Sequence, residues 1–258
     1  MNEIILKKLK DIEDKENVKI IFAVESGSRA WGFASADSDY DVRFIYVRTL
    51  SDYLSLFPLK DTIDYQCDEI FDIQGWDLSK ALKLLYKSNP TLYEWNNSPI
   101  IYVNTNEYQS LEQAFDYYYQ TSKALHHYYH MSIQSYQTRP YTIKKCLYTL
   151  RTLLCCLWII EKQTIPPIEF NKLIHLLPNH VKPHVNTLLD IKKSHNEKTI
   201  CPQLKILDEY IQTQFIYIQS HLTKDIKKRE FDLLNETFIR IINQSSIISS
   251  DNSCSSND

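Results

Sequence analysis

The stretch from Gly27 to Asp41 reads GSRAWGFASADSDYD and contains two of the three glycines in the chain. The third, Gly75, follows a second acidic run that reads IFDI over residues 70–73. In a chain with so little glycine, we expect each one where the backbone takes a positive φ or closely approaches another group. The pattern therefore predicts one site built from two segments, both of which carry acidic residues.

The chain before and inside this stretch predicts a phosphate-binding turn. Residues 18–25 (VKIIFAVE) are mostly apolar, which favours a buried strand. Gly27-Ser28 follows directly and predicts a turn or the start of a short helix. Backbone N–H groups at such a turn, with a nearby hydroxyl, are suited to holding phosphate oxygens. The Ser28 side chain could instead only cap the helix, and both roles use the same geometry.

Three aspartates predict a metal site beside that turn. Asp39 and Asp41 stand at the start of a second predicted strand, residues 40–47 (YDVRFIYV). Alternate strand residues share a face, so the two carboxylates lie roughly 6–7 Å apart along the chain and favour a cation between them. Mg²⁺ prefers such oxygen ligands and is commonly shared with substrate phosphates. Asp72 on a further strand would complete a three-carboxylate site for two metal ions, which promote in-line displacement at phosphorus. Read alone, Asp39 and Asp41 could simply cap a turn.

This arrangement of Gly-Ser, Asp-x-Asp and a later Asp resembles the DNA polymerase β-type nucleotidyltransferase superfamily. More closely, it resembles the branch associated with RNA repair operons (RlaP or YcgL type). The segments that carry this resemblance are ESGSRAWGF (25–33), SDYDVR (38–43), DIQGWDLSKAL (72–82), SNP (88–90), EW (94–95), HY (127–128) and residues 144–151. The resemblance runs from about residue 20 to residue 175. It departs at Cys146, where an aromatic residue is expected, and residues beyond 180 resemble nothing we can name.

The resemblance implies an α+β chain in which an N-terminal mixed-sheet nucleotidyltransferase domain is followed by a helical bundle. The almost wholly helical pattern from residue 107 onward places the boundary near residue 104, so the two domains are expected over 1–104 and 105–245, and the end of the chain, rich in Ser, Asn and Asp, predicts a disordered tail (246–258). The resemblance also implies transfer of a nucleoside monophosphate from a triphosphate to an acceptor hydroxyl, with two Mg²⁺ or Mn²⁺ ions. Asp39 and Asp41 would bind both ions, and Asp72 would bind the catalytic ion. The implied acceptor is an RNA end. A protein or small-molecule acceptor, a non-catalytic nucleic-acid-binding module and a helical interaction protein stay open as alternatives.

Further substrate-binding residues are predicted on one strand and two helices. Arg43 shares a strand face with the carboxylates and either neutralises them or contacts phosphate. Lys144, Tyr148 and Arg151 fall on one helical face, where they either clamp the triphosphate or form an exposed basic stripe. Lys145 would take this role in a different register. His127 either borders the nucleotide or only packs.

Composition sets the remaining bounds. The 258 residues have 43% hydrophobic and 24% charged content and a net charge of −3, which is ordinary for a soluble globular protein. Six scattered cysteines form no metal-finger spacing and indicate reduced thiols. The longest apolar run, residues 153–160, is too short to span a bilayer. We therefore expect a cytoplasmic protein without a membrane association, and see no sign of a protein partner.

Secondary structure is predicted as a mixed α/β region followed by helices. Further strands are expected over 62–67, 69–73 and 100–103. Helices are expected over 3–14, 51–57, 78–87 with Asp77 as N-cap, a short one from Pro90, 111–137, 141–162, 168–177, 204–221 and 230–242.

Overall fold

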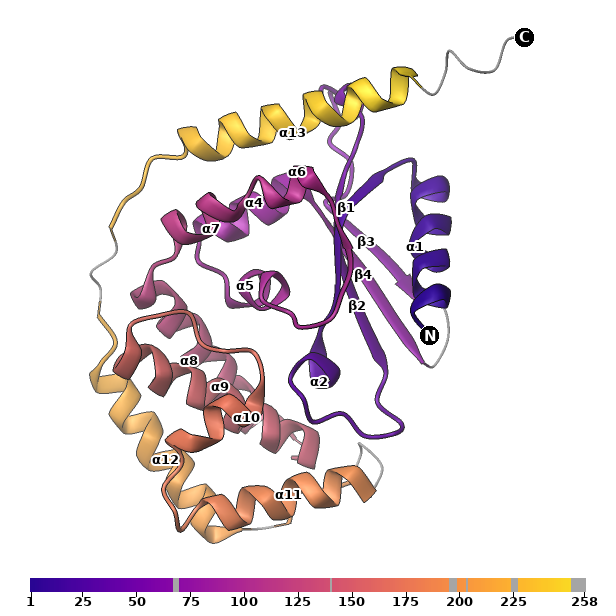
Figure 1. Cartoon of the computed structure of the whole chain (residues 1–258). Coiled ribbons are helices and arrows are strands. Elements are labelled where there is room, and N and C mark those ends of the chain that lie inside the picture. Colours follow the sequence, from indigo (N-terminus) through magenta and orange to yellow (C-terminus); the bar gives the residue numbers. More distant parts are fainter. Residues whose placement is uncertain (67–69, 140, 195–198, 203, 224–226, 252–258) are drawn as a thin grey trace.

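The computed structural model describes residues 1–66, 70–139, 141–194, 199–202, 204–223 and 227–251, and the side chains of all but 246–251 among them (Figure 1). Its N-terminal part is a five-stranded sheet with the order β3-β4-β2-β1-β5. The strands are β1 (Lys19–Glu25), β2 (Tyr40–Val47), β3 (Thr62–Gln66), β4 (Phe71–Asp77) and β5 (Ile101–Asn104). β2 and β4 are parallel, whereas the other neighbours are antiparallel. The predicted α+β class with a mixed sheet is thus confirmed.

Helices make up the rest of the regular structure. They are α1 (Asn2–Glu16), α2 (Gly27–Ala30), α3 (Leu50–Tyr53), α4 (Leu78–Tyr86), α5 (Pro90–Asn96), α6 (Asn106–Gln109), α7 (Glu112–Tyr118), α8 (Thr121–Gln137), α9 (Ile143–Lys162), α10 (Phe170–Leu173), the 3₁₀ turn η1 (Ile174–Leu176), α11 (Lys182–Ser194), α12 (Lys205–Ser220) and α13 (Asp232–Asp251). In the part of the chain that the structure describes, no helix combines the length and apolar character needed to cross a bilayer.

The two faces of the sheet are covered by different helices. α1 packs its buried side chains against one face, where Val42, Phe44 and Tyr46 of β2 belong to the same apolar cluster. Ile45 and Val47 belong to the cluster on the other face, together with residues of α4, α5 and α7. Because side chains alternate along a strand, Asp41 and Arg43 lie on this second face.

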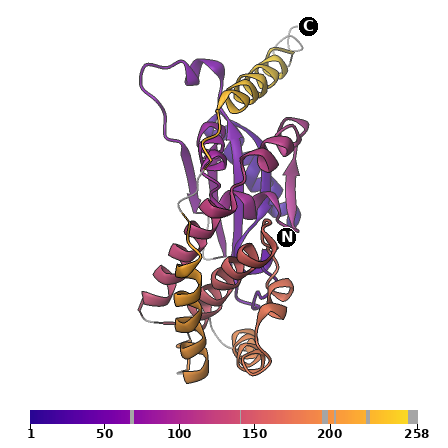
Figure 2. The same cartoon turned by 90° about the vertical axis from the view of Figure 1, so that its left-hand side faces the viewer.

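A second apolar core lies among helices α8 to α12, which gather below the sheet region in Figures 1 and 2. The chain segment after α2 reaches into this core. The Phe33 ring packs edge-on against the Phe170 ring at a centroid distance of 5.4 Å, and the Trp31 carbonyl accepts a hydrogen bond from the Phe170 N–H at 2.9 Å. The turn that follows β1 is therefore anchored in the helical part of the molecule.

The structure differs from the predicted elements at several points in the helical part. The helix expected over 111–137 is interrupted at Tyr119, whose φ and ψ of −63° and 127° are extended. The Ser88 hydroxyl enters the break, donating to the Tyr118 carbonyl and accepting from the Gln120 N–H, both at 3.0 Å. α11 forms between the helices expected over 168–177 and 204–221, where no element was predicted.

The C-terminal helix α13 returns to the sheet region (Figure 2). Leu234, Ile241 and Ile242 join the apolar cluster that also contains residues of α4 and α7. α13 continues to Asp251, whereas the sequence predicts a disordered tail from residue 246. Residues 252–258 of that predicted tail lie outside the described residues. The division of the chain near residue 104 stays a prediction, and α13 shares its core with the part before that boundary.

Candidate active site

Asp41 and Asp72 stand side by side on the parallel strands β2 and β4, where their Cα positions are register partners. The guanidinium of Arg43 lies between them, with Nη2 3.2 Å from Asp41 Oδ1 and 2.6 Å from Asp72 Oδ2. The pKa of Asp41 is raised mainly by burial; the charges of Arg43 and Lys144 lower it, and those of Asp72 and Asp39 raise it. Asp41, Asp72 and Arg43 are thus in direct contact, and the charges of Asp39 and Lys144 also act on Asp41.

Gly27 allows the turn after β1 to approach this group. Its φ is +58°, and a Cβ added there would lie 1.9 Å from Asp41 Oδ2. Glycine is therefore required at this position both for its backbone conformation and for the close approach of the carboxylate. Ser28 follows as a buried residue in α2. Gly75, which the sequence grouped with the site, is needed for a different reason. A Cβ there would lie 2.1 Å from the ring of Phe44, so this glycine leaves space for core packing.

Two residues that the sequence reasoning gave no role hold the aspartates in place. Arg29 donates to the Asp39 carbonyl at 3.1 Å and to the Ser38 carbonyl at 2.6 Å, with its guanidinium 3.8 Å from the Tyr40 ring centroid. Arg29 thereby fixes the backbone that enters β2. The signal for it was its place in the quoted stretch directly after Gly27-Ser28.

The second is Glu25, whose side chain is fully buried. Glu25 accepts hydrogen bonds from the Asp41 N–H at 2.9 Å and from the Tyr102 hydroxyl at 2.5 Å. Burial raises the pKa of this carboxyl group, and the two hydrogen bonds partly oppose that effect. An acidic residue that ends an otherwise apolar strand was the sequence signal for it.

The carboxylate oxygens of this site suit a divalent cation, but the Arg43 guanidinium lies between those of Asp41 and Asp72. Within the described residues, no three His, Cys, Asp or Glu side chains are arranged so that they could hold a metal ion. Asp39, Asp41 and Asp72 nevertheless offer only oxygen ligands, which Mg²⁺ and Mn²⁺ prefer. The residue types therefore fit such an ion, provided that the guanidinium leaves its position between Asp41 and Asp72.

The predicted basic face of α9 divides into an exposed and a buried part. Lys144 is exposed, and Tyr148 is half-buried with its ring 5.5 Å from the ring of Trp31. Lys145 is half-buried, and its carbonyl accepts a hydrogen bond from the Ser135 hydroxyl of α8 at 3.2 Å. The charge of Lys144 lowers the pKa of Asp41, so this residue of the face acts on the carboxylate site.

The position of Arg151 argues against its predicted contact with a triphosphate. The residue is fully buried, and its Nη1 lies 2.8 Å from Glu94 Oε1. Its guanidinium also lies 4.7 Å from the Trp31 ring centroid. Glu94 accepts further hydrogen bonds from the Tyr128 hydroxyl at 3.0 Å and the Trp31 indole N–H at 3.3 Å. This network joins α5, α8, α9 and the turn after α2, which gives Arg151 a structural position.

His127 lies on α8, half-buried near the backbone of Lys87 at the C-terminal end of α4. Its pKa is lowered mainly by burial and also by the charges of His130, His126 and Lys123, while a hydrogen bond with the backbone of Lys87 opposes this shift. These neighbours differ from those of Asp41, so the structure does not group His127 with the carboxylates.

Comparison with known proteins identifies relatives over nearly the whole chain. A family model described as the RNA repair pathway DNA polymerase beta family matches residues 1–240. The protein YcgL of Bacillus subtilis (strain 168) is 37% identical over 243 residues, which cover 92% of this chain and 93% of the relative. Among solved structures, spectinomycin adenyltransferase AAD(9) from Enterococcus faecialis, with ATP and spectinomycin, is 14% identical at a TM-score of 0.41, covering 85% of this chain and 98% of that one.

Proposed function

Because this chain belongs to the RNA repair pathway DNA polymerase beta family, we propose that it is a nucleotidyltransferase that adds a nucleoside monophosphate to a hydroxyl at an RNA end. The acceptor oxygen forms a bond to the α-phosphorus of a nucleoside triphosphate, and the bond from that phosphorus to the β-phosphate oxygen breaks. Pyrophosphate leaves, and the proton of the hydroxyl passes to a carboxylate and then to solvent.

One observation carries this proposal: Asp41 and Asp72 meet as register partners while Gly27 presses the turn after β1 against Asp41. This geometry supports the proposal because the N–H groups of the turn would receive phosphate directly beside paired carboxylates. Such proximity is what phosphoryl transfer requires, since most of its catalysis comes from positioning and charge neutralisation.

Asp39, Asp41 and Asp72 would hold Mg²⁺ or Mn²⁺ ions, which when bound supply neutralising charge to the phosphates and the acceptor oxygen. Asp72 has 59% of its side chain exposed against 25% for Asp41. We therefore assign Asp72 to the acceptor side, where its carboxylate receives the proton of the attacking hydroxyl. Asp41, the more buried of the two, lies against Gly27 and would hold the metal ions on the side of the turn.

Cationic and aromatic side chains complete the proposed nucleotide site. Lys144 supplies positive charge to the triphosphate from the start of α9, and Tyr148 and Trp31 form the aromatic wall beside it. Arg43 leaves Asp41 and Asp72 when the substrate and its ions bind, and then faces the phosphates. Gly27 and Ser28 offer the N–H groups of the first turn of α2, which have no partner within that helix.

The RNA acceptor is supported by the family description. The experiment incubates the protein with each of the four α-labelled triphosphates, Mg²⁺ or Mn²⁺, and an RNA oligonucleotide, a protein extract or small hydroxyl compounds. Label on RNA supports the proposal, whereas label only on protein or on a small compound would assign a different acceptor class. No transfer from any triphosphate would favour a non-catalytic nucleic-acid-binding protein.

Asp41→Asn tests the site itself and should reduce transfer by at least about a hundredfold, since it removes a carboxylate that would hold both ions. Asp64→Asn is the matched control. Asp64 is exposed on β3, and its carboxylate accepts a hydrogen bond from Gln74 at 2.6 Å. Equal activity of the two variants would rule out the proposed site.

A further inference from the structure

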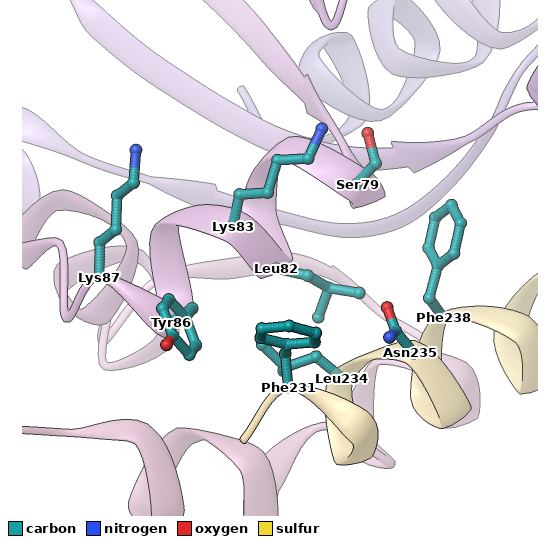
Figure 3. A pocket seen from close by; sticks show the side chains of 9 residues that line it. All are labelled: Ser79, Leu82, Lys83, Tyr86, Lys87, Phe231, Leu234, Asn235 and Phe238. Carbon is teal, nitrogen blue, oxygen red and sulfur yellow. The ribbon is translucent and has the colours of Figure 1, made fainter. Parts of the chain in front are cut away.

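A groove lies between α4 and the start of α13, on the side of the molecule where the C-terminal helix returns to the sheet region (Figure 3). Its volume is about 450 Å³, and its lining residues include no acid. Its apolar lining consists of Leu82, Phe231, Leu234 and Phe238. α4 begins where β4 ends, and Asp72 is at the opposite end of β4. The groove is therefore distinct from the carboxylate site.

Hydrogen bonds build the end of this groove from segments far apart in the sequence. The Tyr86 hydroxyl donates to the Arg229 carbonyl at 3.0 Å, and the Tyr118 hydroxyl donates to the Glu230 carbonyl at 2.7 Å. The Tyr86 and Phe231 rings meet at a centroid distance of 6.3 Å. Phe231 is nevertheless 53% exposed. An aromatic ring is thus held at the mouth of the groove with one side open to solvent.

The rim of the groove is cationic. Lys83 and Lys87 are exposed, one helical turn apart, and extend from the same side of α4 (Figure 3). Neither side chain has an acidic partner among the residues that the structure describes. Lys123 lies next to them, with Nζ 3.2 Å from the Tyr86 carbonyl and 5.0 Å from its ring centroid.

Two further observations place more positive charge beside this rim. Burial, and then the charge of Arg229, lower the pKa of Lys123, so two cations face each other here. Arg229 Nε is buried without a hydrogen-bond partner within the described chain. Lys227 and Lys228 precede it and are exposed. A cluster of cations that repel one another is stabilised by an anionic ligand.

We infer that this groove, lined by Lys83, Tyr86, Lys87, Phe231 and Phe238, binds single-stranded RNA at a distance from the reacting end. Phosphates contact Lys83, Lys87 and Lys123, and a base stacks on the open side of Phe231. A positive groove with exposed aromatic rings is the usual arrangement for single strands, because every base offers a face for stacking. The inference rests on the RNA acceptor of the proposed function.

The test measures the affinity of a fluorescein-labelled 12-nucleotide single-stranded RNA by anisotropy, without triphosphate. Lys83→Gln combined with Lys87→Gln should weaken binding at least tenfold and reduce the magnitude of the slope of log affinity against log salt by about 1.4, at ~0.7 per phosphate contact. Phe231→Ala should weaken binding about tenfold without changing that slope. All three side chains are exposed, so these variants should retain the fold.

Lys7→Gln combined with Lys193→Gln is the matched control. It removes the same charge from exposed positions on α1 and α11 and should bind RNA like the wild type. The groove assignment is overturned if the groove variants bind RNA like this control, or if the wild type does not bind RNA. It is also overturned if sedimentation shows a wild-type dimer that Phe231→Ala dissociates while RNA affinity is unchanged.

The same measurements separate this inference from the proposed reaction. Loss of RNA affinity in the groove variants of a protein that transfers no nucleotide would support the groove and reject the reaction. Transfer to RNA by a protein whose groove variants keep full affinity would support the reaction and reject the groove.

Discussion

Arg43 occupies the space that a cation between Asp41 and Asp72 would need, so replacing it should tighten divalent-metal binding. Its Nη2 lies 3.2 Å from Asp41 Oδ1 and 2.6 Å from Asp72 Oδ2. At about 5 Å and an effective dielectric constant near ~20, two unit charges of the same sign repel by about 3 kcal/mol. Because Asp72 is 59% exposed, solvent screens part of this repulsion. We therefore expect about 1.4 kcal/mol, or tenfold tighter binding, for Arg43→Gln.

The assay titrates Mn²⁺ into the protein without nucleotide and follows free Mn²⁺ by electron paramagnetic resonance. Arg48→Gln is the matched control, because it removes the same charge just beyond the other end of β2, where Arg48 donates to the Lys60 carbonyl at 3.4 Å. Adding Asp41→Asn to Arg43→Gln should abolish the gain. If Arg43→Gln binds Mn²⁺ no more tightly than Arg48→Gln, the guanidinium does not compete with a metal ion and the reasoning fails.

Three other perturbations have defined outcomes. Gly27→Ala and Gly32→Ala both force alanine to a positive φ, at +58° and +82°, which costs about 1–2 kcal/mol. Only Gly27→Ala should also weaken Mn²⁺ binding, since only its Cβ meets Asp41; equal Mn²⁺ affinities of the two variants would contradict this. Burial raises the pKa of Asp41, so on lowering the pH its carboxylate takes up a proton sooner than an exposed aspartate would; Mn²⁺ affinity of the wild type should start to fall above pH ~4, and an onset below it would refute the shift. Glu94→Gln leaves the fully buried Arg151 without its anion and should lower the free energy of unfolding in urea by about 3–5 kcal/mol. Arg151→Met should lower it less, because Glu94 keeps the Tyr128 hydroxyl and the Trp31 indole N–H as donors. A larger loss for Arg151→Met would show that the Glu94–Arg151 ion pair is not the main contact of Arg151.

The sequence predicted the parts of the site that depend on local periodicity. The period of two along residues 40–47 placed Asp41 and Arg43 on one face, and the structure confirms their contact. Asp77 was predicted as the N-cap of the helix that follows it, and its carboxylate accepts from the Ser79 N–H at 2.8 Å. Both predictions need only the geometry of one element, which its own residues determine.

Contacts between distant elements could not be predicted in the same way. Gly75 stands beside acidic residues in the sequence, but glycine is needed there because the Phe44 ring on the neighbouring strand occupies the space of a Cβ. Helical spacing placed Arg151 on the face of Lys144, but did not show that Glu94 of α5 lies opposite. The break before α8 depends on Ser88, which lies 30 residues earlier in the chain. In each case the partner comes from another element, which a single sequence does not specify.

Arg151 can still affect the reaction without touching the nucleotide, because the turn that contains Gly27 continues directly into Trp31. The Trp31 ring lies against the Arg151 guanidinium, and its indole N–H bonds the same Glu94 that Arg151 neutralises. The Trp31 carbonyl is bound in turn by the Phe170 N–H of α10. A shift of the helices would therefore move the turn beside Asp41 together with them. The buried Glu94–Arg151 pair thus links α9, which carries Lys144, to the turn beside Asp41, and Arg151 would act as a positioning residue for the proposed transfer.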